Sequence, residues 1–184
     1  MISLAKLKKS ISCRLRGVVN IEALKKKGLR IGTNTKILPG CTMDPSHCWL
    51  ITIGNNVTLS ERVHILAHDA STEKHLHYTK IGLVSVGDNT FIGADTIVLP
   101  NVTIGNNCVI GAGSIVSKNV PDNTIFAGNP AKFICKTDEY TAKHEELMKN
   151  ATLFDESFTI RKNITNEQKA QMIEALKKGM GYVK

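Results

Sequence analysis

The histidines are the side chains of this sequence best suited to moving a proton near neutral pH. Six are present, namely His47, His64, His68, His75, His77 and His144. A free imidazole titrates near pH 6.5 and can remove a hydroxyl proton while the oxygen attacks an acyl group. Such a base works best when an acceptor holds its second nitrogen and so selects one tautomer. The histidines are therefore candidate general bases, and acidic residues near them are candidate partners.

The cysteines offer less chemistry. There are five, so they do not pair by number, and no C-x-x-C spacing occurs. This usage indicates neither a disulfide framework nor a structural zinc site, and it fits a reducing cytoplasm. The segment from Ile2 to Leu7 also lacks the apolar stretch of a signal peptide. We therefore expect a cytoplasmic protein.

The elements that position these residues follow from a repeat of six. Aliphatic residues recur at that interval, each followed four residues later by a small or β-branched residue. The first set is Val86, Ile92, Val98, Ile104, Ile110 and Val116, and the second is Thr90, Thr96, Val102, Cys108, Ser114 and Val120. Neither a helix nor an ordinary strand has this period. A chain that turns a corner every six residues does, so the pattern predicts a hexapeptide-repeat parallel β-helix. Gly87, Gly93, Gly105 and Gly111 follow four of these aliphatic residues, where we expect the backbone to bend.

The repeat extends toward the N-terminus in two interrupted blocks. Ile31, Ile37 and Met43 keep the interval, and Ile53, Leu59 and Ile65 resume it after a frame shift at residues 45–49. Val86 follows Ile65 by 21 positions, three more than three hexads, so the polar residues 71–79 are predicted to be a loop outside the solenoid. With about 18 residues per coil, the repeat of residues 31–136 would form roughly five to six coils.

The flanking segments are predicted to be helical. Residues 1–30 carry nine Lys or Arg residues against Glu22, whereas residues 31–184 carry fifteen of each sign, so the net charge of +8 lies in this arm. An apolar stripe at helical spacing runs from Leu4 to Val18, and Asn20 can cap a second helix. We expect the arm to cover the first coil as a helical cap with a solvated basic face, and the alternative is that it contacts an anionic membrane. We expect no nucleic-acid binding, because no aromatic residues alternate with the basic residues of the arm.

The C-terminal extension, residues 137–184, is also predicted to be helical. A helix is expected over residues 138–150, and a capping box at Thr165 opens another that ends near Gly179.

One segment carries a resemblance to a known family. Residues 104–132 read IGNNCVIGAGSIVSKNVPDNTIFAGNPAK. The motif from Ile110 to Val116, the Val120-Pro121 pair and the ending Gly128-Asn-Pro-Ala-Lys132 resemble the acetyl-CoA-binding end of the hexapeptide-repeat acyltransferases. The likeness is closest to maltose, xenobiotic and polysaccharide O-acetyltransferases, and it implies a left-handed parallel β-helix. It also implies a homotrimer whose acetyl-CoA clefts lie between subunits.

The resemblance assigns cofactor contacts along this end of the solenoid. Ala94 and Ala112 occupy the same place in consecutive coils, and their backbone groups would bind the pantetheine arm. With the glycines before them, Gly93 and Gly111, they form the expected cofactor track. Ser117 and Lys118 would meet the far part of the cofactor, and Lys132 would lie near its phosphates.

The resemblance also selects His68, which precedes the predicted loop as does the catalytic histidine of these enzymes. Two acids could orient it. Asp69 is adjacent, although neighbouring side chains alternate in direction on a strand. Asp44 would lie near His68 if Met43 stacks on Ile65. Asp44 could instead bind the acceptor, so the assignment stays open. Direct attack of the acceptor on acetyl-CoA is expected, because Cys41 and Cys108 should point into the core and no activated nucleophile is apparent.

The implied function is O-acetylation of a sugar hydroxyl of the capsule, O-antigen or exopolysaccharide type. Amino-sugar and serine acetyltransferases are alternatives within the family. Trp49 could stack on a sugar ring, or its apolar ring could fill the interruption of the repeat or a subunit contact. A zinc enzyme of the γ-carbonic anhydrase type would need three converging histidines. His64 and His68 could contribute, with His47 or His75, but the residue two coils before His68 is Gly32. We therefore expect no required metal.

Overall fold

The computed structural model describes residues 20–184, which form two compact units divided after Thr137. The predicted helix over residues 4–18 lies outside the described residues. The helix predicted after Asn20 is confirmed as α2 (Ile21–Lys26), and the Asn20 side chain accepts a hydrogen bond from the backbone N–H of Ala23 at 3.0 Å. Leu24 of α2 is buried against the first coil, so this helix caps the solenoid.

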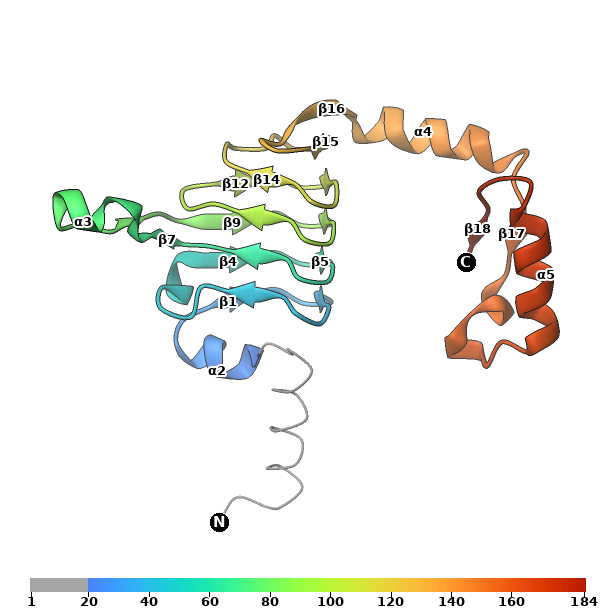
Figure 1. The fold of residues 1–184 in the computed structure, drawn as a ribbon, viewed down its shortest axis with the longest axis horizontal. Coiled ribbons are helices and arrows are strands. Elements are labelled where there is room, and N and C mark those ends of the chain that lie inside the picture. Colours follow the sequence, from blue (N-terminus) through green and yellow to red (C-terminus); the bar gives the residue numbers. More distant parts are fainter. Residues whose placement is uncertain (1–19) are drawn as a thin grey trace, which may run out of the picture. The chain divides into compact units, whose positions relative to one another are not determined.

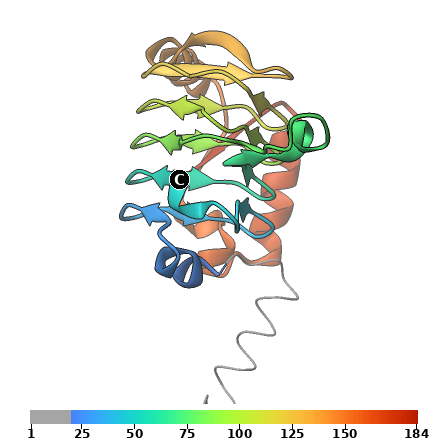
Figure 2. The ribbon, with the colours of Figure 1, turned by 90° about the vertical axis from the view of Figure 1, so that its left-hand side faces the viewer.

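The hexads form a three-sided parallel β-helix (Figures 1 and 2). Each side is a sheet whose strands come from successive coils. The first sheet contains β1 (Arg30–Ile31), β4 (Ile51–Ile53), β9 (Val84–Val86) and β12 (Thr103–Ile104). The second contains β2 (Lys36–Ile37), β5 (Thr58–Leu59), β10 (Phe91–Ile92), β13 (Val109–Ile110), β15 (Thr124–Ala127) and the antiparallel β16 (Lys132–Lys136). The third contains β3 (Thr42–Met43), β6 (His64–Ile65), β11 (Ile97–Val98) and β14 (Ile115–Val116).

The repeat residues fill the core as predicted. All six aliphatic residues of the uninterrupted block are at most 2% exposed, and the small residues that follow them are at most 3% exposed. The buried hydroxyls among the small residues have partners: Thr90 Oγ1 donates to the carbonyl of Gly105 at 2.9 Å, and Thr96 Oγ1 to that of Gly111 at 3.2 Å. Cys41 and Cys108 are buried and free, which confirms their expected place in the core.

The number of coils lies at the lower end of the expected five to six. Four regular coils are followed by a fifth, irregular turn that begins at Val120, which bridges to Ile104. Ile53 pairs with Val86, which lies 33 residues later and not about 18 residues later as in an uninterrupted coil. The stretch from Ile65 to Val86 therefore crosses a single corner of the solenoid. Most of it is an insertion, which is much longer than the three extra residues inferred from the sequence.

This insertion projects from the solenoid (Figure 1). Its base is an antiparallel pair, β7 (His68–Asp69) with β8 (Lys80–Ile81). Between these strands lie a 3-10 turn, η2 (Ala70–Thr72), and one helical turn, α3 (Glu73–Leu76). The predicted loop at residues 71–79 is thus confirmed as a projection, with short helical structure of its own.

The glycines of the repeat serve a different purpose from the one expected. The corners are turned by non-glycine residues with positive φ, including Asn56, Asn89 and Asn107 at 53–55°. Asparagine tolerates this region better than most residues. Gly87 and Gly93 do not adopt positive φ. A Cβ atom on Gly93 would lie 2.5 Å from the backbone nitrogen of Ala112 in the next coil. These glycines are needed because adjacent coils approach closely.

The second unit, Asp138–Lys184, is small and largely exposed. It contains most of α4 (Thr137–Met148), then β17 (Leu153–Phe154) paired with β18 (Tyr182–Val183), and α5 (Asn166–Leu176). Two 3-10 turns, η3 (Glu156–Phe158) and η4 (Ile160–Lys162), precede α5. The capping box expected at Thr165 is present with Gln168. None of the helices described in residues 20–184 is long and apolar enough to cross a membrane.

Candidate active site

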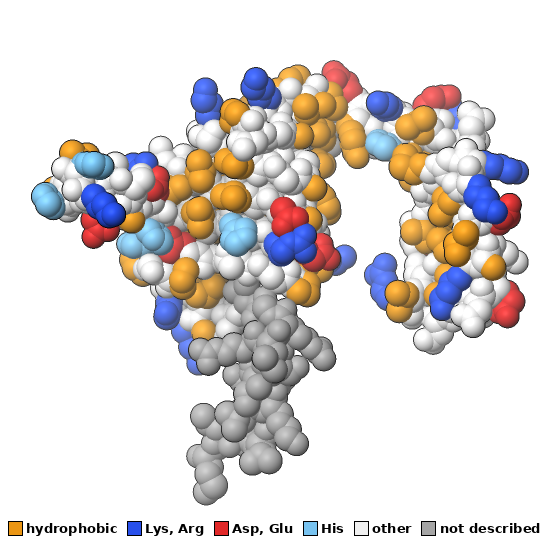
Figure 3. All heavy atoms as spheres, in the orientation of Figure 1, with side chains coloured by type: hydrophobic (Ala, Val, Ile, Leu, Met, Phe, Trp, Pro, Cys, Tyr) orange, Lys and Arg blue, Asp and Glu red, His pale blue; other side chains and the backbone are white. Residues whose placement is uncertain are grey.

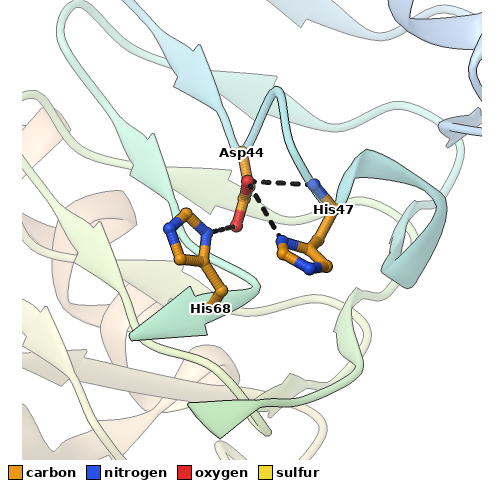
Figure 4. Close-up of side chains that lie close together, drawn as sticks. All are labelled: Asp44, His47 and His68. Carbon is orange, nitrogen blue, oxygen red and sulfur yellow. Dashed lines mark hydrogen bonds and ion pairs between the residues drawn. The ribbon is translucent and has the colours of Figure 1, made fainter. Parts of the chain in front are cut away.

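A buried carboxylate, that of Asp44, organises the site around His68 (Figure 4). Asp44 follows β3, and its side chain is inaccessible to solvent. Its Oδ1 accepts hydrogen bonds from the backbone N–H groups of Ser46 and His47, both at 3.0 Å. Its Oδ2 accepts from the N–H of Ala67 at 3.1 Å and lies in hydrogen-bond contact with His68 Nδ1. The carboxylate is therefore fixed by donors from two neighbouring coils.

This environment sets the charge of Asp44. Burial by itself raises the pKa of a carboxyl group, but the hydrogen bond from His68 and those from the backbone of His47, Ser46 and Ala67 together lower the pKa of Asp44 below its ordinary value. Asp44 is thus an anion at neutral pH. Its partner nitrogen, His68 Nδ1, carries the proton because a carboxylate can only accept.

His68 is consequently left with a free Nε2. It begins β7 directly after the buried Ala67, and its side chain is 34% exposed. With the proton on Nδ1, Nε2 has a lone pair that can accept a proton. The pair of Asp44 and His68 rests on the stacking of Met43 on Ile65, which the structure contains in the register that the sequence suggested. A held imidazole with one accessible basic nitrogen can act as a general base.

The second acid considered for this role, Asp69, has other partners. Its carboxylate contacts Lys80 Nζ at 2.6 Å and accepts from the N–H of Ser71 at 2.8 Å. The hydrogen bonds from Lys80 and then Ser71 lower the pKa of Asp69 to about 2. The suggestion that Asp69 orients His68 is therefore corrected: the contact is made by Asp44. The reason is the alternation of side chains along β7, which directs Asp69 away from its neighbour.

His47 also belongs to this cluster, although the sequence suggested it only as a ligand of the rejected zinc enzyme. Its ring centroid lies 5.1 Å from that of His68 and 5.2 Å from that of Trp49. Its Nδ1 lies 4.0 Å from Asp44 Oδ1. The sequence signal that could have revealed His47 is the break in the hexads at residues 45–49. Residues inserted directly after the candidate acid Asp44 leave the regular coil, so their side chains can turn back toward that carboxylate. His64, by contrast, contacts Thr42 Oγ1 at 2.6 Å and lies outside the cluster.

Four of the predicted cofactor positions lie at the corner between the second and third sheets in successive coils, namely Gly93, Ala94, Gly111 and Ala112. Gly93 is buried, Ala94 is half-buried and Ala112 is exposed. At this corner, each coil donates a backbone hydrogen bond to the coil before it: Asp95 to Glu61 at 3.0 Å, and Gly113 to the carbonyl of Ala94 at 2.7 Å. The carbonyl of Ala94 is therefore already engaged.

The corner changes in the next coil. In that coil the irregular turn at Gly128-Asn129-Pro130 takes the place next to Ala112. Among the backbone hydrogen bonds of the described residues, none is donated to the Ala112 carbonyl. Gly111, the other glycine of the predicted track, is half-buried beside Ala127. Ser117 and Lys118 are exposed at the next corner of the solenoid, which follows β14, and Lys132 is exposed at the start of β16. The corner at Ala112 thus offers a backbone acceptor on an exposed residue, with small side chains beside it.

Comparisons with known proteins agree with this architecture. The family described as bacterial transferase hexapeptide (six repeats) matches residues 84–118. Protein CapG of Staphylococcus aureus is 37% identical over 161 residues, which cover 85% of this chain and 88% of that protein. Putative acetyltransferase YvoF of Bacillus subtilis (strain 168) is 40% identical over 101 residues, or 55% of each chain.

A solved structure extends this likeness to three dimensions. It is the hexapeptide-repeat acetyltransferase VCA0836 from Vibrio cholerae O1 biovar eltor, complexed with acetyl coenzyme A. It aligns with a TM-score of 0.55 at 27% identity, and the alignment covers 60% of this chain and 61% of that chain. The shared part is less than two thirds of either chain.

Proposed function

Because this chain belongs to the hexapeptide-repeat acetyltransferases, which have a left-handed β-helix, we propose that it transfers the acetyl group of acetyl-CoA to a sugar hydroxyl. The observation that carries the proposal is the His68 imidazole, held by the buried Asp44 and open to solvent at Nε2. Acetyl-CoA as donor is supported by the acetyl coenzyme A complex of VCA0836.

The reaction needs one proton to be moved twice. As the acceptor oxygen attacks the thioester carbonyl, His68 Nε2 takes the hydroxyl proton. When the carbon–sulfur bond breaks, the same nitrogen returns the proton to the departing thiolate. Asp44 stabilises the imidazolium between these steps and keeps Nδ1 protonated. Direct transfer is supported by the burial of Cys41 and Cys108, which are at most 1% exposed and cannot act as nucleophiles.

The cofactor is proposed to run along the corner that holds Gly93, Ala94, Gly111 and Ala112. Small side chains leave room for a pantetheine arm, and the accessible Ala112 carbonyl can accept a hydrogen bond from one of its amides. Ser117 and Lys118 lie at the next corner of the same coil, after β14, and Lys132 begins β16 opposite Ala127. We propose that these residues meet the far part of the cofactor, where the two lysines suit its phosphates.

The acceptor is proposed to be a glycan of the capsule, O-antigen or exopolysaccharide type. Trp49 is 48% exposed and lies one ring away from the cluster around His68, so a sugar could stack on it beside the base. Contact of residues 1–30 with an anionic membrane would suit a lipid-linked acceptor. Residues 1–19 of that arm lie outside the described part of the chain, so this stays a prediction.

Thiol release from acetyl-CoA tests the proposed function. The purified protein is incubated with nucleotide-linked sugars, free sugars, amino sugars and serine, and CoA thiol is measured. We expect release with a glycan acceptor in the wild type. Ala112→Trp should abolish it, because the indole would fill the pantetheine track, whereas Ala112→Ser should retain it. Since Ala112 is exposed, both variants should melt near the wild-type temperature. Turnover with serine and with no glycan would disprove the acceptor class.

A homotrimer is proposed for the assembly, since the expected cofactor cleft would be completed by a neighbouring solenoid. Hydrophobic side chains gather on the solenoid face seen in Figure 3. Large apolar residues of the solenoid unit are exposed, among them Ile81, Leu83 and Phe91 at 43–65%. Such surface is commonly covered by a partner. Sedimentation should give three times the chain mass of 20.1 kDa. A single chain at micromolar concentration would contradict the trimer.

A further inference from the structure

We propose that Asp44, His47 and His68 form a binding site for a divalent transition-metal ion of the Zn²⁺ type, and that the bound ion blocks the base. The site supplies two imidazoles and one carboxylate, the donor set with which proteins often hold Zn²⁺ while one position stays open to solvent. The ion is not needed for acetyl transfer. Its binding depends only on these three residues, whereas its inhibitory effect rests on the proposed function.

The geometry brings the three donors close enough to share one ion. One ligand atom from each residue lies within 4.8 Å of the other two. In a tetrahedral Zn²⁺ site with bonds of about 2.0–2.2 Å, two ligand atoms lie about 3.3–3.6 Å apart. The pair of His47 Nδ1 and Asp44 Oδ1, at 4.0 Å, is slightly wider than this separation. Small side-chain rotations would bring in the third donor.

An unpaired nitrogen points independently to a missing partner. His47 Nδ1 is buried and makes no hydrogen bond, and it is the single buried side-chain nitrogen or oxygen in residues 20–184 with this property. It faces a fully buried carboxylate, that of Asp44, across the gap described above (Figure 4). A buried polar atom without a partner costs free energy, so it is normally satisfied by protein, water or a ligand. A cation between these two groups would satisfy the nitrogen and balance the carboxylate charge.

The surroundings also suit a metal ligand. Backbone N–H groups of Ser46 and His47 already hold Asp44 Oδ1, and the N–H of Ala67 holds Oδ2. Outer hydrogen bonds of this kind orient a carboxylate toward a metal and are a regular part of such sites. Only the hydrogen bond from His68 to Asp44 would have to be given up. The ion would therefore take the place that the Nδ1 proton of His68 now occupies and leave the rest of the network intact.

The tautomer of His68 links this site to the reaction. A neutral imidazole has one proton, which sits on Nδ1 while Asp44 accepts it. A metal bound to Nδ1 needs the lone pair of that nitrogen, so the proton must move to Nε2. Nε2 is then a donor and can no longer remove a proton from the acceptor. Metal binding and acetyl transfer are therefore mutually exclusive at His68.

Titration of the untagged full chain with ZnCl₂ tests the proposal. Calorimetry should give one ion per chain, and Co²⁺ should give an absorption spectrum of nitrogen and oxygen ligands without thiolate bands. His47→Gln should weaken binding by at least about tenfold, because loss of a ligand should cost no less than loss of an outer-shell partner. His75→Gln, which changes an exposed histidine of the projecting segment, is the matched control and should bind as the wild type does.

Activity provides the second readout. Zn²⁺ should inhibit thiol release, and His47→Gln should need at least about ten times more Zn²⁺ for half-inhibition, relative to its own metal-free rate. Absence of stoichiometric Zn²⁺ or Co²⁺ binding at about 100 times the protein concentration would overturn the proposal, as would equal binding by His47→Gln. A chain that binds Zn²⁺ through His47 but releases no thiol with any acceptor would support the metal site and disprove the proposed function.

Discussion

His68→Ala is expected to lower the turnover of acetyl transfer by about 10²–10⁴-fold, the range for removal of a general base. The base acts in the transition state and does not hold the cofactor, so the affinity for acetyl-CoA should change little. Steady-state thiol release gives turnover, and calorimetric titration with CoA gives affinity. The folded state should persist, because the His68 side chain is one-third exposed and fills no core position.

His64→Ala is the matched control for this variant. His64 lies in the same coil, on β6, and its side chain forms a hydrogen bond with Thr42, outside the cluster around His68. Its loss should leave turnover close to that of the wild type. Near wild-type turnover in His68→Ala with the true acceptor would remove His68 from the mechanism. An equal loss in both variants would indicate a general effect of changing this coil.

Asp44→Asn is expected to lower turnover by about 10²–10⁴-fold as well, through the tautomer of His68. An amide has one acceptor oxygen, whereas Asp44 accepts from donors on both of its oxygens. If the amide nitrogen faces His68, that imidazole must accept at Nδ1 and carry its proton on Nε2. The flipped amide would keep the tautomer, but its nitrogen would face two N–H groups, those of Ser46 and His47, instead of the single N–H of Ala67, so the first arrangement is favoured. Either arrangement leaves buried donors opposed, which should also cost about 1–3 kcal/mol of folding stability.

Asp69→Asn separates this effect from a simple change of charge beside His68. It removes the neighbouring carboxylate, which pairs with Lys80 and not with His68, so turnover should fall far less than in Asp44→Asn. Thiol release and thermal melting of the two variants supply the comparison. A larger loss of turnover in Asp69→Asn than in Asp44→Asn would reverse the assignment of the orienting acid.

The sequence alone was sufficient for the solenoid and its interior. A period of six leaves one arrangement in which Ile92, Val98 and Ile110 all point inward, and each of these residues is buried. The two flanking helical features with local signals, the Asn20 cap and the Thr165 capping box, were also predictable because a cap depends on residues within one turn. Helix caps and a repeating coil can be predicted from the sequence because residues close together in the chain determine them.

The corners of the coils and the length of the insertion could not be predicted in the same way. The pattern predicts glycine at the corners, but the corners are turned by residues such as Asn89 and Asn107, while Gly93 makes room for the backbone of the next coil. The length of the insertion after Ile65 was underestimated for a related reason. A hexad count assumes that every residue belongs to the repeat, and only the pairing of Ile53 with Val86 shows where the solenoid resumes.

The active site, like the solenoid, was predictable from the sequence only in part. The sequence, through its family resemblance, singled out His68, and its hexad register suggested that Asp44 could lie beside it. It could not choose between Asp44 and Asp69, because that choice depends on the direction of each side chain and on contacts across two coils. It also missed the place of His47 beside Asp44, since the insertion at residues 45–49 has no period to fix its course. Only the tertiary structure brings the two histidines to one buried carboxylate, because stacking of coils joins residues that are far apart in the chain.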